Sequence, residues 1–251
     1  MIKLRKVEII KKIHSKAKIH DSSFIDDYCS IGSSVIIEKN VHVSKNTIIY
    51  GKALIKEGTY IGENCIIGHP QREELKRLIE KNISDIESTN EMTEIGRTCT
   101  IRAGSIIYSN VILGDNCQTG HNVMIREKTK IDRNSLIGTN AVIDGNVVIG
   151  ENVSIQTGVY IPLFCKIGNN VFMGPYSKLT NDKYMMRKKY DLIGPILEDE
   201  VSLGANSVIL PGVKLKKGTI VGAGSIVTKD TEEYDVVVGN PAKKINKVSN
   251  L

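Results

Sequence analysis

Aliphatic residues return every six positions along most of the chain. The series begins at Ile19, breaks after Ile67 and again after Leu179, and ends at Val227. An amphipathic helix would repeat its apolar positions with a period of about 3.6, and a half-buried strand with a period of about 2. A period of six instead predicts one short strand and one corner per hexad. Three hexads would close a triangular coil.

The series contains 30 hexads, which predicts an all-β protein, a parallel β-helix of about ten triangular coils. Coils stacked at about 4.8 Å would hydrogen bond to one another as strands do in a sheet. A small residue follows each aliphatic one after four positions, commonly preceded by the Asn or Gly that a turn with positive φ requires. The core is then a ladder of Ile and Val, which fits the 5% aromatic content. We expect this β-helix domain over residues 1–230 and a short C-terminal tail over residues 231–251.

Two segments interrupt the repeat. The first, near residues 69–93, holds Leu75, Leu78 and Ile79 at helical spacing and predicts a partly helical insertion. We interpret it as a surface excursion with no catalytic role. The second predicts a protruding loop near residues 180–196, whose four basic residues and two tyrosines suit a phosphorylated ligand; a merely solvated loop is the alternative.

Charge and composition narrow the possible functions. The formal net charge of +6 suits small anionic ligands and is too dispersed to indicate nucleic acid. No apolar run approaches the roughly 20 residues of a membrane span, and no signal peptide follows the basic N-terminus. The five cysteines all fall on the small-residue position of their hexads, without C-x-x-C pairing. We therefore expect buried thiols, no metal site and a cytoplasmic location.

His121 is the candidate general base. It follows by two residues Thr119, which replaces the aliphatic member of one central hexad. Its polar neighbours are Gln118, Asn122, Arg126 and Glu127. A lone histidine at a polar break in a regular repeat is a natural place for acid–base chemistry. The alternative is a corner histidine with a purely structural role.

The last coils hold a candidate site for a phosphorylated ligand. Two Gly-Ala pairs lack bulk and would let a ligand approach the backbone, and nearby lysines would neutralise phosphates. These residues are Gly204, Ala205, Gly222, Ala223, Lys229, Lys243 and Lys244. Repeats such as Ile-Gly-Glu-Asn-Val-Ser and Val-Gly-Ala-Gly-Ser-Ile, with the run Gly239-Asn240-Pro241-Ala242-Lys243, resemble the hexapeptide-repeat acyltransferases. The resemblance implies left-handed coils, acetyl-CoA as the acyl donor, and a homotrimer with its sites between subunits.

A narrower resemblance concerns the acceptor. The segment Gln118–Val123, followed by Arg126-Glu127, Gly174-Pro175 and Thr180-Asn181-Asp182, is similar to the bacterial nucleotide-linked amino-sugar N-acetyltransferases. Those enzymes acetylate the amino group of dTDP- or UDP-linked deoxysugars for surface glycans. The resemblance implies that Gln118, Asn122, Arg126, Glu127, Asn181 and Asp182 bind the substrate. The chain departs from the pattern at Lys183, where many relatives have Pro-Arg. An O-acetyltransferase and a non-catalytic scaffold are the alternatives.

Overall fold

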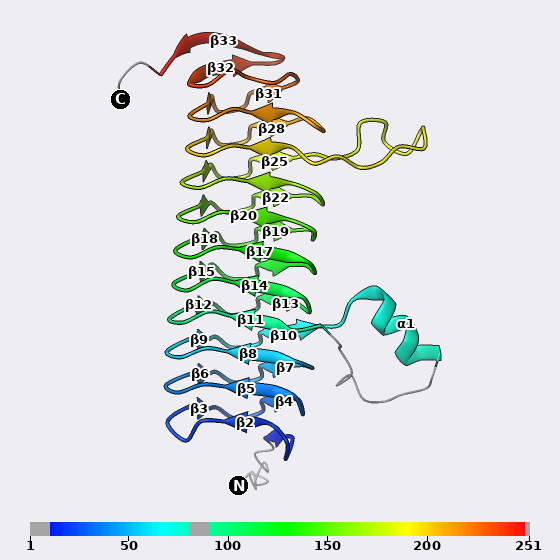
Figure 1. Ribbon diagram of the computed structural model, residues 1–251, viewed down its shortest axis with the longest axis vertical. Helices are drawn as coiled ribbons and strands as arrows, with labels where there is room; N and C mark the ends of the chain where they lie inside the picture. The colour runs from blue at the N-terminus through cyan, green and yellow to red at the C-terminus, as the bar shows by residue number, and fades with distance from the viewer. Residues whose placement is uncertain (1–10, 81–90, 249–251) are drawn as a thin grey trace, which may run out of the picture.

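The computed structural model, which describes residues 11–80 and 91–248, is a left-handed parallel β-helix (Figure 1). Short strands wind around one axis and form three sheets of 11, 10 and 12 strands, here sheets 1, 2 and 3. Each coil passes through all three sheets in turn. The fold predicted from the hexad period is confirmed. Within the described residues, no helix is long and apolar enough to cross a membrane.

Sheets 1 and 2 are parallel throughout. Sheet 1 contains β1 (Lys12–Ile13), β4 (Ser30–Ile31), β7 (Ile48–Ile49), β10 (Ile66–His69), β13 (Ile106–Tyr108), β16 (Met124–Ile125), β19 (Val142–Ile143), β22 (Tyr160–Ile161), β25 (Lys178–Leu179), β28 (Val208–Ile209) and β31 (Ile226–Val227). Sheet 2 contains β2 (Lys18–Ile19), β5 (Val35–Ile37), β8 (Ala53–Ile55), β11 (Thr93–Ile95), β14 (Val111–Leu113), β17 (Thr129–Ile131), β20 (Val148–Ile149), β23 (Lys166–Ile167), β26 (Ile196–Leu197) and β29 (Lys214–Leu215).

Sheet 3 ends in the one antiparallel pair of the described chain, β32 with β33. Its strands are β3 (Phe24–Ile25), β6 (His42–Val43), β9 (Tyr60–Ile61), β12 (Thr100–Ile101), β15 (Gln118–Thr119), β18 (Leu136–Ile137), β21 (Ser154–Ile155), β24 (Phe172–Met173), β27 (Ser202–Leu203), β30 (Ile220–Val221), β32 (Asp235–Gly239) and β33 (Ala242–Lys247). Figure 1 shows this pair at the C-terminal end of the stack.

The aliphatic residue of each hexad points into the core. In the register of sheet 1, for example, Ile125 pairs with Ile143 of the next coil, and both are fully buried. The corners turn through residues with positive φ, among them Asn134 (φ 60°) and Gly158 (φ 69°), as the sequence predicted. Since Asn tolerates this conformation, it also builds ladders of side-chain amides, such as the one from Asn116 to Asn134 at 3.2 Å.

The prediction of about ten coils is slightly low, because the stack extends beyond the hexads used for it. One further strand, β1, precedes Ile19 and contains Ile13, which is six positions earlier and continues the same period. At the other end, Val237 lies outside the six-residue register, yet it is buried where β32 pairs with β30. The division of the chain at residue 230 stays a prediction.

Both interruptions leave the stack at corners that join sheet 1 to sheet 2, and Figure 1 shows them projecting on the same side. The first contains helix α1 (Arg72–Glu80), which confirms the predicted helical insertion. Glu74 Oε2 accepts a hydrogen bond from the Gln71 amide at 2.8 Å, a capping interaction at the start of the helix. Leu75 and Ile79 remain 37% and 80% exposed.

The cysteines line the inside of the corners, where all five are buried, free thiols. The sulfur atoms of the first four lie near carbonyl oxygens, such as Cys99 Sγ to Gly114 O at 3.2 Å. Burial raises the pKa of Cys65 to about 11 and that of Cys99 and Cys165 to about 12. Burial likewise raises the pKa of the remaining two thiols. The interpretation of the cysteines as buried thiols is therefore confirmed.

These thiols should resist modification. A free cysteine, with a pKa near 8.5, is partly thiolate at pH 8, whereas the pKa of about 11 to 12 of Cys65, Cys99 and Cys165 leaves almost none of the reactive form. The raised pKa of Cys29 and Cys117 acts in the same direction, and all five side chains are buried. We expect a disulfide reagent such as Ellman's to modify none of the five thiols in the folded protein at pH 8, and all five in denaturant. Rapid modification of even one thiol under native conditions would contradict this assignment.

Candidate functional site

The corners stack into columns that run the length of the protein, and the predicted site residues fall on two of them. The His121 column consists of the corners that join sheet 3 to sheet 1, namely Gly120–Val123 and the equivalent residues of other coils. The Arg126 column consists of the corners that join sheet 1 to sheet 2, namely Arg126–Lys128 and its equivalents. In each coil, a sheet 1 strand runs from a corner of the His121 column to a corner of the Arg126 column.

The backbone of His121 is held firmly while its side chain is exposed. Its amide donates to Thr139 Oγ1 at 3.2 Å, and its carbonyl accepts from the Asn140 amide at 2.9 Å. The following residue, Asn122, makes the turn with φ 54°. Within the described chain the imidazole nitrogens make no hydrogen bond, so both are available to a ligand. The structure thus fixes the backbone of His121 and leaves its imidazole exposed at the corner.

The polar break at Thr119 has a local explanation. Thr119 is fully buried, and its Oγ1 accepts a hydrogen bond from the Arg102 amide at 2.9 Å. The guanidinium of Arg102 also donates to the Thr119 carbonyl at 2.8 Å. Sequence reasoning did not single out Arg102, although it lies 18 residues, or one coil, before Gly120 in the His121 column. A cation therefore lies directly beside the histidine's coil.

Gln118 and Asn122 flank this corner. Gln118 is exposed on the outer face of sheet 3, between Thr100 and Leu136 in the register. The side chain of Asn122 folds over Gly104 of the preceding coil, where a Cβ would collide with its Oδ1. Both polar side chains thus belong to the same edge of the stack as His121.

Arg126 and Glu127 lie at the other edge of β16 and bind each other. The Arg126 guanidinium donates to both Glu127 carboxylate oxygens, at 3.2 and 3.0 Å, and to Asp144 Oδ1 at 2.8 Å. Burial acts to lower the pKa of Arg126, but the Asp144 hydrogen bond and the Glu127 charge raise it above its usual value. The guanidinium also lies 5.6 Å from the ring centre of Tyr108. One guanidinium thus holds two carboxylates, and the cluster carries a formal net charge of −1.

Asn181 and Asp182 shape the protruding loop, which leaves from the Arg126 column. Asn181 Nδ2 donates to the Leu163 carbonyl at 3.3 Å and ties the loop to the coil before it. The Asp182 carboxylate accepts three backbone amides, those of Tyr184 and Met185 at 2.9 Å and that of Met186 at 3.0 Å. These two side chains are therefore occupied in holding the loop.

The predicted donor residues fall on the His121 column and beyond it. Ala205 and Ala223 occupy corners equivalent to His121 in later coils, with Ala223 exposed. Five coil steps separate β15 from β30, so His121 and Ala223 lie about 24 Å apart at a coil spacing of about 4.8 Å. Gly204 is required by coil packing, since a Cβ there would collide with the Ala223 backbone. Gly222 similarly packs against Val238.

The three lysines predicted to bind the donor phosphates differ in their ion pairs. Lys229 and Lys243 are exposed at the C-terminal end of the stack and make no ion pair within the described residues. Lys244 instead pairs with Asp235 at 2.7 Å. Burial acts to raise the pKa of Asp235, but the bond to Lys244 and the Glu232 amide hold it below its usual value. Lys244 therefore contributes to holding β33 on β32.

A largely apolar surface separates the two columns. It is the outer face of sheet 1, on which the outward residues of successive strands follow one another in register. They are Ile48, Ile66, Ile106, Met124, Val142 and Tyr160. Lys178 follows Tyr160 on this face, and the equivalent face of sheet 2 is interrupted by Lys130 and Lys166. A single subunit thus places His121 and Arg126 at opposite edges of an apolar face.

Comparison with known proteins supports the repeat assignment. Residues 92–127 and 128–162 match the family model described as bacterial transferase hexapeptide (six repeats), and residues 196–229 match that of the hexapeptide repeat of succinyl-transferase. A 2,3,4,5-tetrahydropyridine-2,6-dicarboxylate N-acetyltransferase of Staphylococcus aureus is 54% identical over 56 residues. That match spans 22% of this chain and only 23% of the relative.

The solved structures that resemble this chain have lower sequence identity to it. A maltose O-acetyltransferase from Clostridium difficile is 26% identical, with TM-score 0.41 over 47% of this chain and 68% of that one. The UDP-N-acetylglucosamine acyltransferase of Arabidopsis is 21% identical, with TM-score 0.45 over 94% and 74%. A Bacillus cereus N-acyltransferase, solved with dTDP-4-amino-4,6-dideoxyglucose and coenzyme A, is 18% identical, with TM-score 0.34 over 72% and 90%. TM-scores this low support no conclusion about function.

Proposed function

We propose that this chain, which belongs to the hexapeptide-repeat family, is an acetyl-CoA-dependent N-acetyltransferase acting on the amino group of a nucleotide-linked amino-deoxysugar. One observation carries the proposal. The exposed imidazole of His121 lies in the same corner column as Ala205 and Ala223, the small residues predicted to contact the donor. The N-acetyltransferase activity named for the S. aureus relative is of the same reaction class.

The donor would lie along the His121 column. With the thioester at His121, an extended pantetheine arm would run past Ala205 toward Ala223, about 24 Å away at the coil spacing. The phosphates would then reach the C-terminal end of the stack, where Lys229 and Lys243 are free to bind them. Lys244 is the weaker candidate, because Asp235 already neutralises it.

The chemistry needs a neutral amine and a departing thiol. The amine nitrogen attacks the thioester carbonyl, a C–N bond forms, and the C–S bond breaks to release coenzyme A. An amine with a pKa of about 8 is partly neutral at pH 7, so His121 has only to accept the proton that the nitrogen loses. That proton finally reaches the thiolate, whose pKa is about 8.5 if it resembles cysteine. Positioning of the amine contributes a further part of the acceleration.

A homotrimer would complete this site. If the apolar outer faces of sheet 1 from three subunits surround a three-fold axis, they are removed from water together. Rotation by 120° about an axis parallel to the stack then brings the His121 column of one subunit beside the Arg126 column of the next, at the same height. This arrangement accounts for the separation of the predicted residues within one subunit.

The histidine can be tested directly. His121→Ala should lower turnover with a dTDP- or UDP-linked amino sugar, at the low end of the roughly 10²–10⁴-fold range for loss of a general base. The loss should shrink as the pH rises, because free amine accumulates. A hydroxyl acceptor would instead show a large loss at every pH. The measurement is a pH–rate profile beside wild type and the control His20→Ala; full activity of His121→Ala at pH 7 would refute the role of His121.

The donor position is tested at Ala223. Ala223→Leu should weaken acetyl-CoA binding, because the larger side chain occupies the space the pantetheine arm would use. Isothermal titration calorimetry measures the affinity, and an unchanged melting temperature controls for the fold. Binding as tight as in the wild type would remove this part of the column from the donor site.

Assembly is tested on the face of sheet 1. Light scattering should give about three times the chain mass of 27.7 kDa. Val142→Asp, which introduces a charge into the apolar face, should dissociate the trimer and abolish activity. The matched control is Val148→Asp on sheet 2, where the side chain is already 50% exposed. A monomeric wild type would contradict both the trimer and the intersubunit site.

A further inference from the structure

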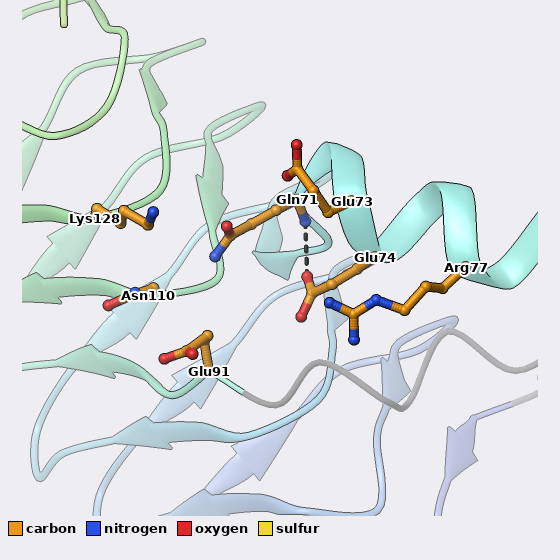
Figure 2. Close-up of a pocket in the computed structure, with 7 residues that line it drawn as sticks. All are labelled: Gln71, Glu73, Glu74, Arg77, Glu91, Asn110 and Lys128. Atoms are coloured by element: carbon orange, nitrogen blue, oxygen red, sulfur yellow. Dashed lines mark hydrogen bonds between the residues drawn. The ribbon is translucent and has the colours of Figure 1, made fainter.

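The start of helix α1 and the stack border an open hollow of about 310 Å³, shown in Figure 2. Gln71, Glu73 and Arg77 line it from the helix side, and Asn110 and Lys128 line it from corners of the Arg126 column. The side chains of Gln71 and Lys128 extend toward each other across it. Small-molecule sites commonly measure about 300–1,000 Å³, so this hollow matches a group the size of one sugar ring.

The hollow holds charges of both signs that lack partners. Arg77, Glu91 and Lys128 line it, and none of the three makes a hydrogen bond or ion pair through its side chain within residues 11–80 and 91–248. Glu74, in contrast, is occupied by the Gln71 amide at 2.8 Å and the Ser109 hydroxyl at 3.4 Å. Glu74 therefore fixes the helix on the stack, and the other charges remain available to a ligand.

The Lys128 edge of the hollow lies at the height of the histidine, while Asn110 and Glu91 line it one and two coils earlier. Lys128 belongs to the corner that follows His121 in the same coil, at the opposite edge of β16. In the trimer proposed above, rotation about the three-fold axis preserves height. The hollow of one subunit would then lie beside the His121 column of its neighbour. The Arg126 cluster with Glu127 and Asp144, adjacent to Lys128, would form a rigid floor.

We propose that this hollow is the acceptor site and that it takes the sugar phosphate part of an amino sugar. Lys128 and Arg77 would bind the phosphate, as cations do. Glu73 and Glu91 would accept hydrogen bonds from the hydroxyl groups of the sugar. The inference rests on the proposed function and gives the insertion a role in substrate binding, where the sequence alone favoured a surface excursion with no catalytic role.

Lys128→Asn is the test variant. Lys128 adopts φ 58°, and Asn occupies the equivalent corner positions of the neighbouring coils at Asn110 and Asn146, so the turn is preserved. The matched control is Lys130→Asn, which changes an exposed lysine two residues away on the outer face of sheet 2. Glu91→Gln removes one acidic group that lines the hollow without changing the size of the side chain.

Loss of a charge-assisted contact should raise the KM for a nucleotide-linked amino sugar about tenfold or more in Lys128→Asn, with kcat and the KM for acetyl-CoA little changed. The same sugar without its phosphates should be used equally by Lys128→Asn and wild type. Lys130→Asn should match wild type with both acceptors. A purely structural role for Lys128 would instead lower kcat, or affect both acceptors alike.

Calorimetry with the same nucleotide-linked sugar, in the absence of acetyl-CoA, separates the two proposals. Weaker binding by Lys128→Asn and Glu91→Gln, with normal binding by Lys130→Asn, supports the hollow as the acceptor site. Wild-type binding and KM in the hollow variants, with turnover intact, overturn this inference and leave the proposed function standing. Failure of the wild type to bind or acetylate any such sugar, while it still binds acetyl-CoA, overturns both.

Discussion

Each strand hydrogen bonds to the strand one coil later, and without an insertion that partner lies 18 residues further along the chain, as Ile137 pairs with Ile155. The fixed spacing of this ladder decides which residue each position accepts. An inward position receives one aliphatic side chain per coil, and a corner leaves little room for a Cβ where successive coils touch. Gly120 shows the limit, because a Cβ there would collide with the Thr139 backbone. The hexad pattern in the sequence is the consequence of this fixed spacing.

The same ladder also determines which charged side chains lie next to each other. Residues one coil apart lie side by side, so opposite charges 18 positions apart form ion pairs, as Arg126 does with Asp144 and Arg133 with Glu151. Most such pairs are exposed and contribute little individually. The Arg126 cluster differs because Glu127 and Asp144 are less exposed and both bind one guanidinium. An arginine held by two carboxylates is better suited to line the bottom of a site than to move onto a ligand.

The fold could be predicted from the sequence because every hexad repeats the same physical constraint. The coil count came out low where the pattern weakens, since β32 joins the stack without a hexad spacing from Val227. The site was harder to predict, because a column gathers residues from distant parts of the sequence. Arg102 lies one coil before Gly120, and Asp144 one coil after Arg126. Adding or subtracting 18 would have found both, whereas adjacency in the sequence grouped His121 with Arg126, which the sheet 1 strand keeps apart.

Insertions at corners leave this ladder intact. The strands on either side of the first insertion still pair in register, with Ala53 opposite Thr93 although they are 40 positions apart. The strands on either side of the second insertion also pair in register, since Met173 pairs with Leu203. A corner can therefore accept additional chain without disturbing the core, and both insertions use the same column. If acetylation takes place between subunits, this column faces the neighbour's histidine. The His121 column has no insertion in the described coils and would hold a donor of constant shape. The Arg126 column accepts insertions, so its loops would be free to differ with the acceptor.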